Sequence, residues 1–309
     1  MDMSEPDWRP LAPVQVVEGP PQERRNSPWA LLTIFAAIVV GVLAIALVGR
    51  ATSVGFTTVV EGHPVAVGGQ VVPKEKQAQA TLDTNSRNRL ITPGTPLTEV
   101  TCELPDFDTD AASLEKYYRE AITCLDRAWA APLEEAGKPV KTPQLTVEDS
   151  PRGECGFAPD EDEAVAFYCA EDQVIAMPRS RLIEDAGDDP AFHLSVLAHE
   201  YGHHVQALSG ILGTAARRER VAEEPEVLEL SRRVELQANC FAGLFLAAAR
   251  DRGDIDERLA QDAVGGFAYV DDSDSHGSAN NQLLWAKAGY SGKSAADCDT
   301  WAAAPSEVA

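Results

Sequence analysis

The hydrophobic pattern begins with one long apolar segment. Residues 31–48 are almost wholly aliphatic, and no charged residue interrupts residues 26–49. The run is long enough to cross a bilayer, which takes about 20 apolar residues in a helix. We therefore expect one transmembrane helix at residues 28–49. A cleaved signal peptide is the alternative, although its apolar region would be shorter and would end in a small-residue cleavage site.

The residues around this segment predict its orientation. Two arginines directly precede it and only Arg50 follows closely, so the positive-inside rule places the N-terminus in the cytoplasm. Residues 1–27 are rich in proline and lack apolar periodicity, which indicates a disordered cytoplasmic tail. Residues 50–96 combine glycines and prolines with small polar residues and are expected to form an extracytoplasmic stalk. A folded extracytoplasmic domain should follow at residues 97–309, which predicts a single-pass protein of the cell membrane.

Within residues 97–309 the pattern changes to amphipathic helices and short strands. Apolar residues recur at helical spacing over residues 111–129 and again over residues 225–250. Between them, apolar runs at residues 164–168 and 174–177 flank a polar turn and predict a β-hairpin. The expected fold class is therefore α+β: a mainly helical domain with a small β-sheet or hairpin, preceded by one transmembrane helix.

One more predicted helix carries the main candidate chemistry of the chain. Asp189 is a good N-cap, Pro190 suits the first helical position and Gly210 stands where a helix would stop. Inside this helix, residues 199–203 match the pattern H-E-x-x-H. Apolar residues occupy both faces of the helix, which predicts that it is buried. A chance match on a solvated helix is the alternative, but buried histidines need partners.

The spacing of this motif points to a metal. On a helix, His199 and His203 lie four residues apart on one face, so both imidazoles can bind one ion. Zinc accepts two imidazoles and a third protein ligand, and it keeps the fourth position for water. Glu200, next to the first histidine, would take the proton of that water as the catalytic base.

Glu235 is the expected third zinc ligand. It lies on the helix predicted at residues 225–250 among apolar neighbours, which weakens the alternative of a solvated charge. Asn239 shares its face at i+4 and could fix the ring orientation of a zinc-binding histidine. His276, in an irregular acidic loop, and Tyr201 are candidates for stabilising the oxyanion of the hydrolytic intermediate. A surface or structural role is the alternative for His276.

The strand at residues 174–177 could take part in substrate binding. It directly precedes the metal helix, and an extended peptide can add to an exposed sheet edge by β-augmentation. An ordinary core strand is the alternative.

The six cysteines all follow the apolar segment. An even number on the proposed outer side suggests disulfides, although the sequence alone cannot choose among the many possible pairings. Proximity in the sequence suggests three pairs: Cys102 with Cys124, Cys155 with Cys169 and, by elimination, Cys240 with Cys298. Free, buried cysteines are the alternative, and the absence of a C-x-x-C pair argues against a thiolate metal site.

Four motifs together resemble a known family. They are "HEYGHHVQ" at 199–206, "ELQANCFAG" at 235–243, "FYCAED" at 167–172 and "HGSANNQLLWAKAGY" at 276–290. In this order they look like the neutral zinc metallopeptidases, a bacterial family that often carries an N-terminal membrane segment. The resemblance implies a zincin-like fold with Zn²⁺ bound by His199, His203 and Glu235, and Glu200 as the catalytic acid and base.

The chain departs from this family in two places. Asn239 stands where many relatives have aspartate, and since an amide adds no negative charge, the zinc affinity is expected to be lower. After His276, the arginines associated with other members are replaced by Gln282 and Leu284.

The predicted function is hydrolysis of peptide bonds by a membrane-anchored, extracytoplasmic zinc metallopeptidase with a peptide or protein substrate. One alternative is a catalytically silent zinc-binding scaffold at the cell envelope, against which the intact Glu200 argues. Another is a zinc amidase that acts on cell-wall peptides. A net charge of −23 argues against nucleic acid as a partner. The sequence does not indicate an oligomeric state.

Overall fold

The computed structural model describes residues 74–92, 94–157, 164–268 and 273–309. Within these residues no helix is both long enough and apolar enough to cross a membrane. The predicted fold class is corrected accordingly: the described chain is a mainly helical α+β fold with a small sheet. The segment at residues 28–49, predicted to span the membrane, and the tail before it lie outside the described residues.

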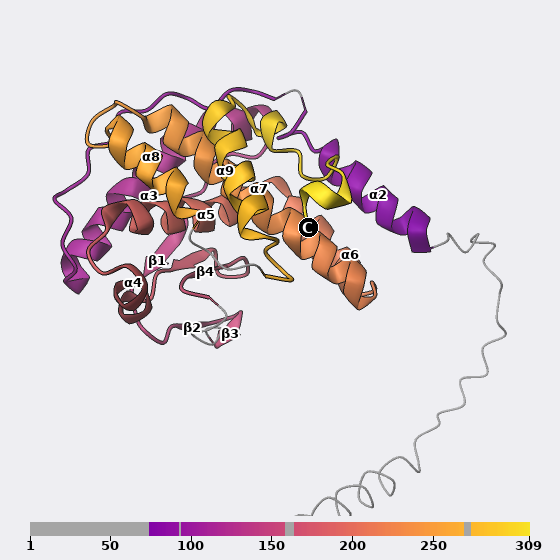
Figure 1. Cartoon of the computed structure of the whole chain (residues 1–309), viewed down its shortest axis with the longest axis horizontal. Helices are drawn as coiled ribbons and strands as arrows, with labels where there is room; N and C mark the ends of the chain where they lie inside the picture. The colour runs from indigo at the N-terminus through magenta and orange to yellow at the C-terminus, as the bar shows by residue number, and fades with distance from the viewer. Residues whose placement is uncertain (1–73, 93, 158–163, 269–272) are drawn as a thin grey trace, which may run out of the picture. The chain divides into compact units, whose positions relative to one another are not determined.

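Helices make up most of the described chain (Figure 1). The α-helices are α2 (Lys74–Ser86), α3 (Ala111–Glu135), α4 (Arg179–Ala186), α5 (Pro190–Ser209), α6 (Ile211–Glu219), α7 (Glu224–Ala249), α8 (Glu257–Gly266) and α9 (Ala279–Ser291). The short 3₁₀ helices are η1 (Ala295–Cys298) and η2 (Pro305–Glu307). The strands are β1 (Gln144–Thr146), β2 (Arg152–Gly153), β3 (Gly156–Phe157), β4 (Phe167–Cys169) and β5 (Val174–Ala176).

Helix α5 lies at the centre of the fold and contacts α3, α6, α7, α8 and the sheet. It begins and ends as predicted. The side chain of Asp189 caps it by accepting a hydrogen bond from the backbone N–H of Ala191, and Gly210 ends it with a positive φ of 88°. A positive φ favours glycine, because glycine has no Cβ atom to clash with the backbone. Apolar side chains on both faces let several elements pack around this one helix.

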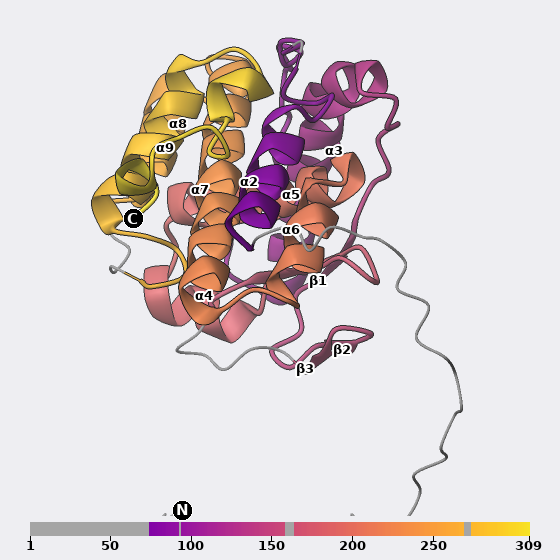
Figure 2. The same cartoon turned by 90° about the vertical axis from the view of Figure 1, so that its right-hand side faces the viewer.

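The small sheet has the strand order β1-β5-β4 and lies beside α5 at the lower end of the molecule in Figures 1 and 2. The predicted hairpin is confirmed, because β4 and β5 pair antiparallel across the turn. The prediction that residues 174–177 offer a free sheet edge to a peptide is wrong. Residues 144–146 form β1, which pairs in parallel with β5 and makes it the central strand.

Helices α7 and α9 pack backbone against backbone. A Cβ atom at Gly243 of α7 would overlap with the carbonyl oxygen of Ala286, and one at Gly289 of α9 would overlap with that of Cys240. The lack of a Cβ atom at both positions therefore permits the close contact of these two helices.

The folded region includes residues from the predicted stalk. Helix α2 packs on α6, and Leu90 and Ile91 are buried in the same core as α5. Two side-chain amides also bond to this part of the fold: that of Asn85 donates to the carbonyl oxygen of Ile211 at 3.4 Å, and that of Asn88 donates to the carbonyl oxygen of Ser209 at 3.1 Å.

Disulfides join segments that are distant in the sequence. The structure contains the three pairs that sequence proximity suggests: Cys102–Cys124, Cys155–Cys169 and Cys240–Cys298. The first ties the segment before α3 to that helix, and the last ties η1 to α7.

Candidate metal centre

Three side chains from α5 and α7 converge on one point. The Nε2 atoms of His199 and His203 are 3.0 Å apart, and each lies 3.2 Å from Oε2 of Glu235. The three side chains are 12–16% exposed, so the point where they meet is largely shielded from solvent. The structure thus brings the three predicted zinc ligands together.

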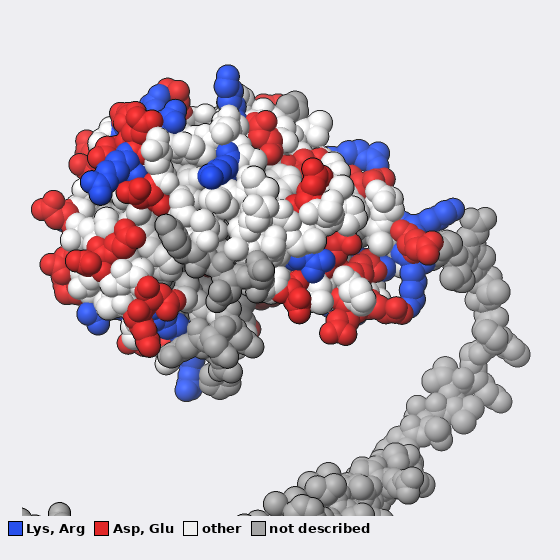
Figure 3. Space-filling model, viewed as in Figure 1, with Lys and Arg blue, Asp and Glu red and all other residues white. Residues whose placement is uncertain are grey.

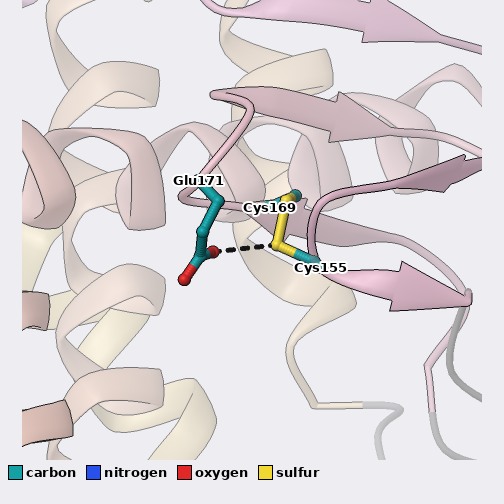
Figure 4. Close-up of side chains that lie close together, drawn as sticks. All are labelled: Cys155, Cys169 and Glu171. Atoms are coloured by element: carbon teal, nitrogen blue, oxygen red, sulfur yellow. Dashed lines mark hydrogen bonds between the residues drawn. A yellow bond between two sulfur atoms is a disulfide. The ribbon is translucent and has the colours of Figure 1, made fainter.

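The donor set and its spacing fit a zinc ion. Two imidazole nitrogens and one carboxylate oxygen form a usual catalytic zinc set, and bonds of about 2.0 Å in tetrahedral geometry place ligand atoms about 3.3 Å apart. The observed separations of 3.0 and 3.2 Å are close to this value. No other group of described residues is similar, because Cys155 and Cys169, which lie near Glu171, form a disulfide and offer no thiolate (Figure 4).

Side-chain amides fix the tautomer of both histidines. Nδ1 of His199 is 2.6 Å from Oδ1 of Asn239, and Nδ1 of His203 is 2.9 Å from Oε1 of Gln206. An amide oxygen only accepts, so each Nδ1 carries a proton and the lone pair available to a metal ion is the one on Nε2. The predicted contact of Asn239 with a ligand histidine is confirmed. Gln206 was not predicted, although its place three residues after His203 on a buried helix is a signal for it.

The charges of the protein groups also favour a cation. Burial works against a charge on Glu235, but the two histidines outweigh it and hold the pKa of this carboxyl well below its usual range. Burial likewise works against a charge on His203, but Glu235 outweighs it and raises the pKa of the imidazole to about 9. The protein groups alone therefore hold a carboxylate against a protonated imidazole, and a divalent cation can take the place of that proton.

Glu200 lies next to His199 on α5 and is only 6% exposed. Burial raises the pKa of its carboxyl; the charge that His199 and His203 can carry opposes this rise, and Glu235 adds to it. A buried carboxyl with a raised pKa is suited to accept a proton and to return it later.

A close contact between α5 and α7 brings Glu235 within reach. A Cβ atom at Gly202 would lie 3.0 Å from both Cα and the carbonyl oxygen of Ala238, which is tighter than most such contacts. Because Ala238 stands between Glu235 and Asn239, this contact sets the distance of both side chains from the histidines.

His276 lies at the edge of the centre. Its Nε2 atom is 3.6 Å from Oε2 of Glu235, its Nδ1 atom is 2.9 Å from the hydroxyl of Ser275, and its side chain is 41% exposed. Burial lowers the pKa of this imidazole; Glu235 opposes the effect, and the two histidine ligands add to it.

Arg232 of α7 holds the loop that carries His276. Its guanidinium donates to the carbonyl oxygen of Asp274 at 2.7 Å and to that of Val308 at 2.8 Å. The arginine thereby connects the loop before α9 to the segment after η2.

Two other side chains of α5 point away from the metal ligands. The hydroxyl of Tyr201 donates to Oδ1 of Asp126 at 2.5 Å and is fully buried, so the prediction that Tyr201 stabilises an oxyanion is wrong. His204 bonds to the hydroxyl of Tyr168 on β4 at 2.9 Å and to the carbonyl oxygen of Lys141 at 2.5 Å. It joins the sheet to α5.

The fold and the site define a mainly helical protein with an H-E-x-x-H metal centre completed by a glutamate from a second helix. Residues 106–301 match the family described as "Putative neutral zinc metallopeptidase", and the chain belongs to this family. The resemblance noted in the sequence is thereby confirmed.

Two bacterial proteins illustrate the relationship. The chain is 30% identical over 207 residues to "Uncharacterized protein YpfJ" of Escherichia coli strain K12, which covers 60% of this chain and 71% of that protein. It is also 30% identical over 178 residues to "Uncharacterized protein Rv2575" of Mycobacterium tuberculosis strain H37Rv, which covers 48% of this chain and 59% of that protein. No solved structure showed a significant match.

Proposed function

We propose that this protein is a zinc-dependent peptidase that hydrolyses peptide bonds. The convergence of His199, His203 and Glu235 beside the buried carboxyl of Glu200 supports this function most strongly. A purely structural zinc site has no need of a base, and its four positions are filled by protein ligands. In the part of the chain that the structure describes, three ligands converge, which leaves one position of a tetrahedral zinc ion for water.

A zinc ion bound by these three side chains would polarise the scissile carbonyl and acidify a water molecule. The remaining steps fall to residues of the chain. Glu200 takes the proton of the attacking water, because its raised pKa lets it hold a proton between the attack of the water and the departure of the amine. It then passes this proton to the leaving amine.

His276 is proposed to stabilise the negative charge that develops on the substrate oxygen. The hydroxyl of Ser275 can donate to its Nδ1 atom, which leaves the proton on Nε2, the atom that faces the centre. A donor aimed at the developing charge typically lowers the barrier by several kcal/mol, on the order of 3.

The free edge of β4 supports a binding site for an extended peptide. Among the described residues, β4 pairs only with β5, and its Tyr168 is bonded to His204, next to the ligand His203. A substrate that adds a strand to this edge would run beside α5.

The three disulfides support a location outside the cytoplasm, because such bonds persist in oxidising compartments. The charge of the domain fits a peptide better than a polyanion as its partner. The net charge of the full chain is −23, and acidic side chains are spread over the face of the domain shown in Figure 3.

The proposal is tested on the full chain by zinc analysis and digestion assays. We expect about one zinc ion per chain, lost in His199→Ala and in Glu235→Ala. Glu200→Gln should keep the zinc and lose at least about a hundredfold in the rate of peptide cleavage. Full activity of Glu200→Gln would contradict the assigned base.

The same assay separates the other functions. Cleavage of peptidoglycan stem peptides but not of protein substrates would favour a cell-wall amidase. Bound zinc without any hydrolysis would favour a silent scaffold.

A further inference from the structure

Two glutamines connect a zinc ligand to the far side of α7. Gln206 of α5 and Gln237 of α7 are both fully buried. The amide nitrogen of Gln206 is 3.1 Å from Oε1 of Gln237, whose own amide nitrogen donates to the carbonyl oxygen of Cys298 at 2.9 Å. With the contact of Gln206 to His203, these bonds form a continuous series.

The direction of every bond in this series is fixed by its ends. The carbonyl oxygen of Cys298 can only accept, so Gln237 must turn its nitrogen to it and its oxygen to Gln206. The nitrogen of Gln206 then donates to that oxygen and also to the carbonyl oxygen of Val234 at 2.8 Å. Only the oxygen of Gln206 is left for Nδ1 of His203.

The far end of the series is held covalently. Cys298 forms a disulfide with Cys240, which lies on α7 one turn after Gln237. The carbonyl group that orients Gln237 is therefore tied to the same helix as Gln237 itself.

We infer that Gln206 is a positioning residue for the zinc site and that Gln237 keeps it in position. Gln206 holds the proton of His203 on Nδ1 and keeps Nε2 free to bind the metal. Loss of a partner that orients a ligand histidine typically weakens metal binding by about 10- to 100-fold. The inference rests on the proposed zinc site and adds two residues that take no part in ligation.

A merely structural role makes a different prediction. Gln206 and Gln237 would then stabilise the packing of α5 on α7, and their replacement would lower stability without changing the proton on His203. The tautomer of His203 and the affinity of the protein for zinc therefore decide between the two roles.

The test uses Gln206→Met, which keeps the length of the side chain and removes its acceptor. Competition with a chromophoric chelator measures the zinc dissociation constant, which should rise about tenfold or more. Nitrogen-15 NMR of the histidine-labelled, zinc-free protein, recorded at a pH above about 9 where the imidazole of His203 is neutral, should show the proton of His203 on Nδ1 in the wild type and a mixture of tautomers in the variant. Thr300→Val is the matched control: its hydroxyl is buried nearby but donates to the carbonyl oxygen of Arg233, outside the series.

Gln237→Met provides a second, more distant variant that decides the matter if Gln206→Met does not fold. It should weaken zinc binding less than Gln206→Met but more than Thr300→Val. Unchanged zinc affinity and an unchanged tautomer in the folded variants would overturn the inference. Absence of zinc binding in the wild type would instead refute the proposed function, and the NMR measurement would still test the role of Gln206.

Discussion

Replacing Gly202 with alanine tests whether the contact of α5 with α7 sets the geometry of the metal centre. The new Cβ atom would lie 3.0 Å from the backbone of Ala238, so α7 would have to move by a few tenths of an ångström. Glu235 and Asn239 would move with it, because both lie on α7 within one turn of Ala238.

The structure also gives the expected size of the effect. Alanine has a better helix propensity than glycine by about 1 kcal/mol. Overpacking a tight core costs about 1 to 3 kcal/mol. Gly202→Ala should therefore destabilise the protein by up to about 2 kcal/mol and weaken zinc binding by about tenfold.

Gly213→Ala is the matched control. Gly213 also lies within a helix, α6, but a Cβ atom there would meet only the end of the Arg217 side chain, at 3.5 Å. This variant should gain about 0.5 to 1 kcal/mol from helix propensity and keep its zinc affinity.

Denaturation by urea, with and without zinc, measures both quantities. The free energy of unfolding in a chelator gives the packing cost, and the additional stability in excess zinc gives the affinity. If Gly202→Ala were as stable as Gly213→Ala and bound zinc equally well, the role assigned to this contact would be refuted.

Three further predictions concern residues around the centre. Arg232→Ala should lower kcat/KM about tenfold, because the loop that carries His276 becomes looser, while the zinc content stays at the wild-type value. Arg232→Lys should be less affected. A loss of zinc as large as the loss of activity would contradict this role. Burial lowers the pKa of His193 below the usual 6.5, so the unfolded chain binds a proton at this imidazole more readily than the folded chain does. The free energy of unfolding should therefore fall as the pH drops below about 6.5. In urea titrations, His193→Leu should lose less of this free energy between about pH 7.5 and about pH 5 than the wild type. Replacing Cys240 and Cys298 together with alanine opens a loop with a sequence separation of 58 and should cost about 4 kcal/mol of unfolding free energy, whereas a loss under about 1 kcal/mol would contradict a constraining role.

Local signals in the sequence predicted the elements of the site well. The N-cap Asp189 and the terminal Gly210 define α5 because they act on their own helix ends, independent of the rest of the fold. Glu235 could be selected because a carboxylate among apolar neighbours on a long helix needs a partner. These inferences use contacts within a turn or two of the chain.

Contacts between distant segments were harder to predict. Residues 144–146 form only three residues of strand, too short for a periodic pattern, and they pair with β5 across an intervening hairpin. The sequence therefore suggested an edge strand where the structure has a central one. Tyr201 was misjudged for a similar reason, since the helical spacing does not reveal that Asp126 of α3 lies opposite its hydroxyl.

The hydrogen-bond partners of His199 and His203 indicate what determines the zinc affinity of this centre. Asn239 and Gln206 are neutral amides, so they fix ring orientation but raise ligand basicity less than a carboxylate would. Among the three side chains His199, His203 and Glu235, the carboxylate of Glu235 is the one negatively charged group. The affinity for zinc must then rest more on geometry than on charge. Substitutions that move α7 relative to α5 should consequently harm zinc binding more than substitutions that change the charge of the surface.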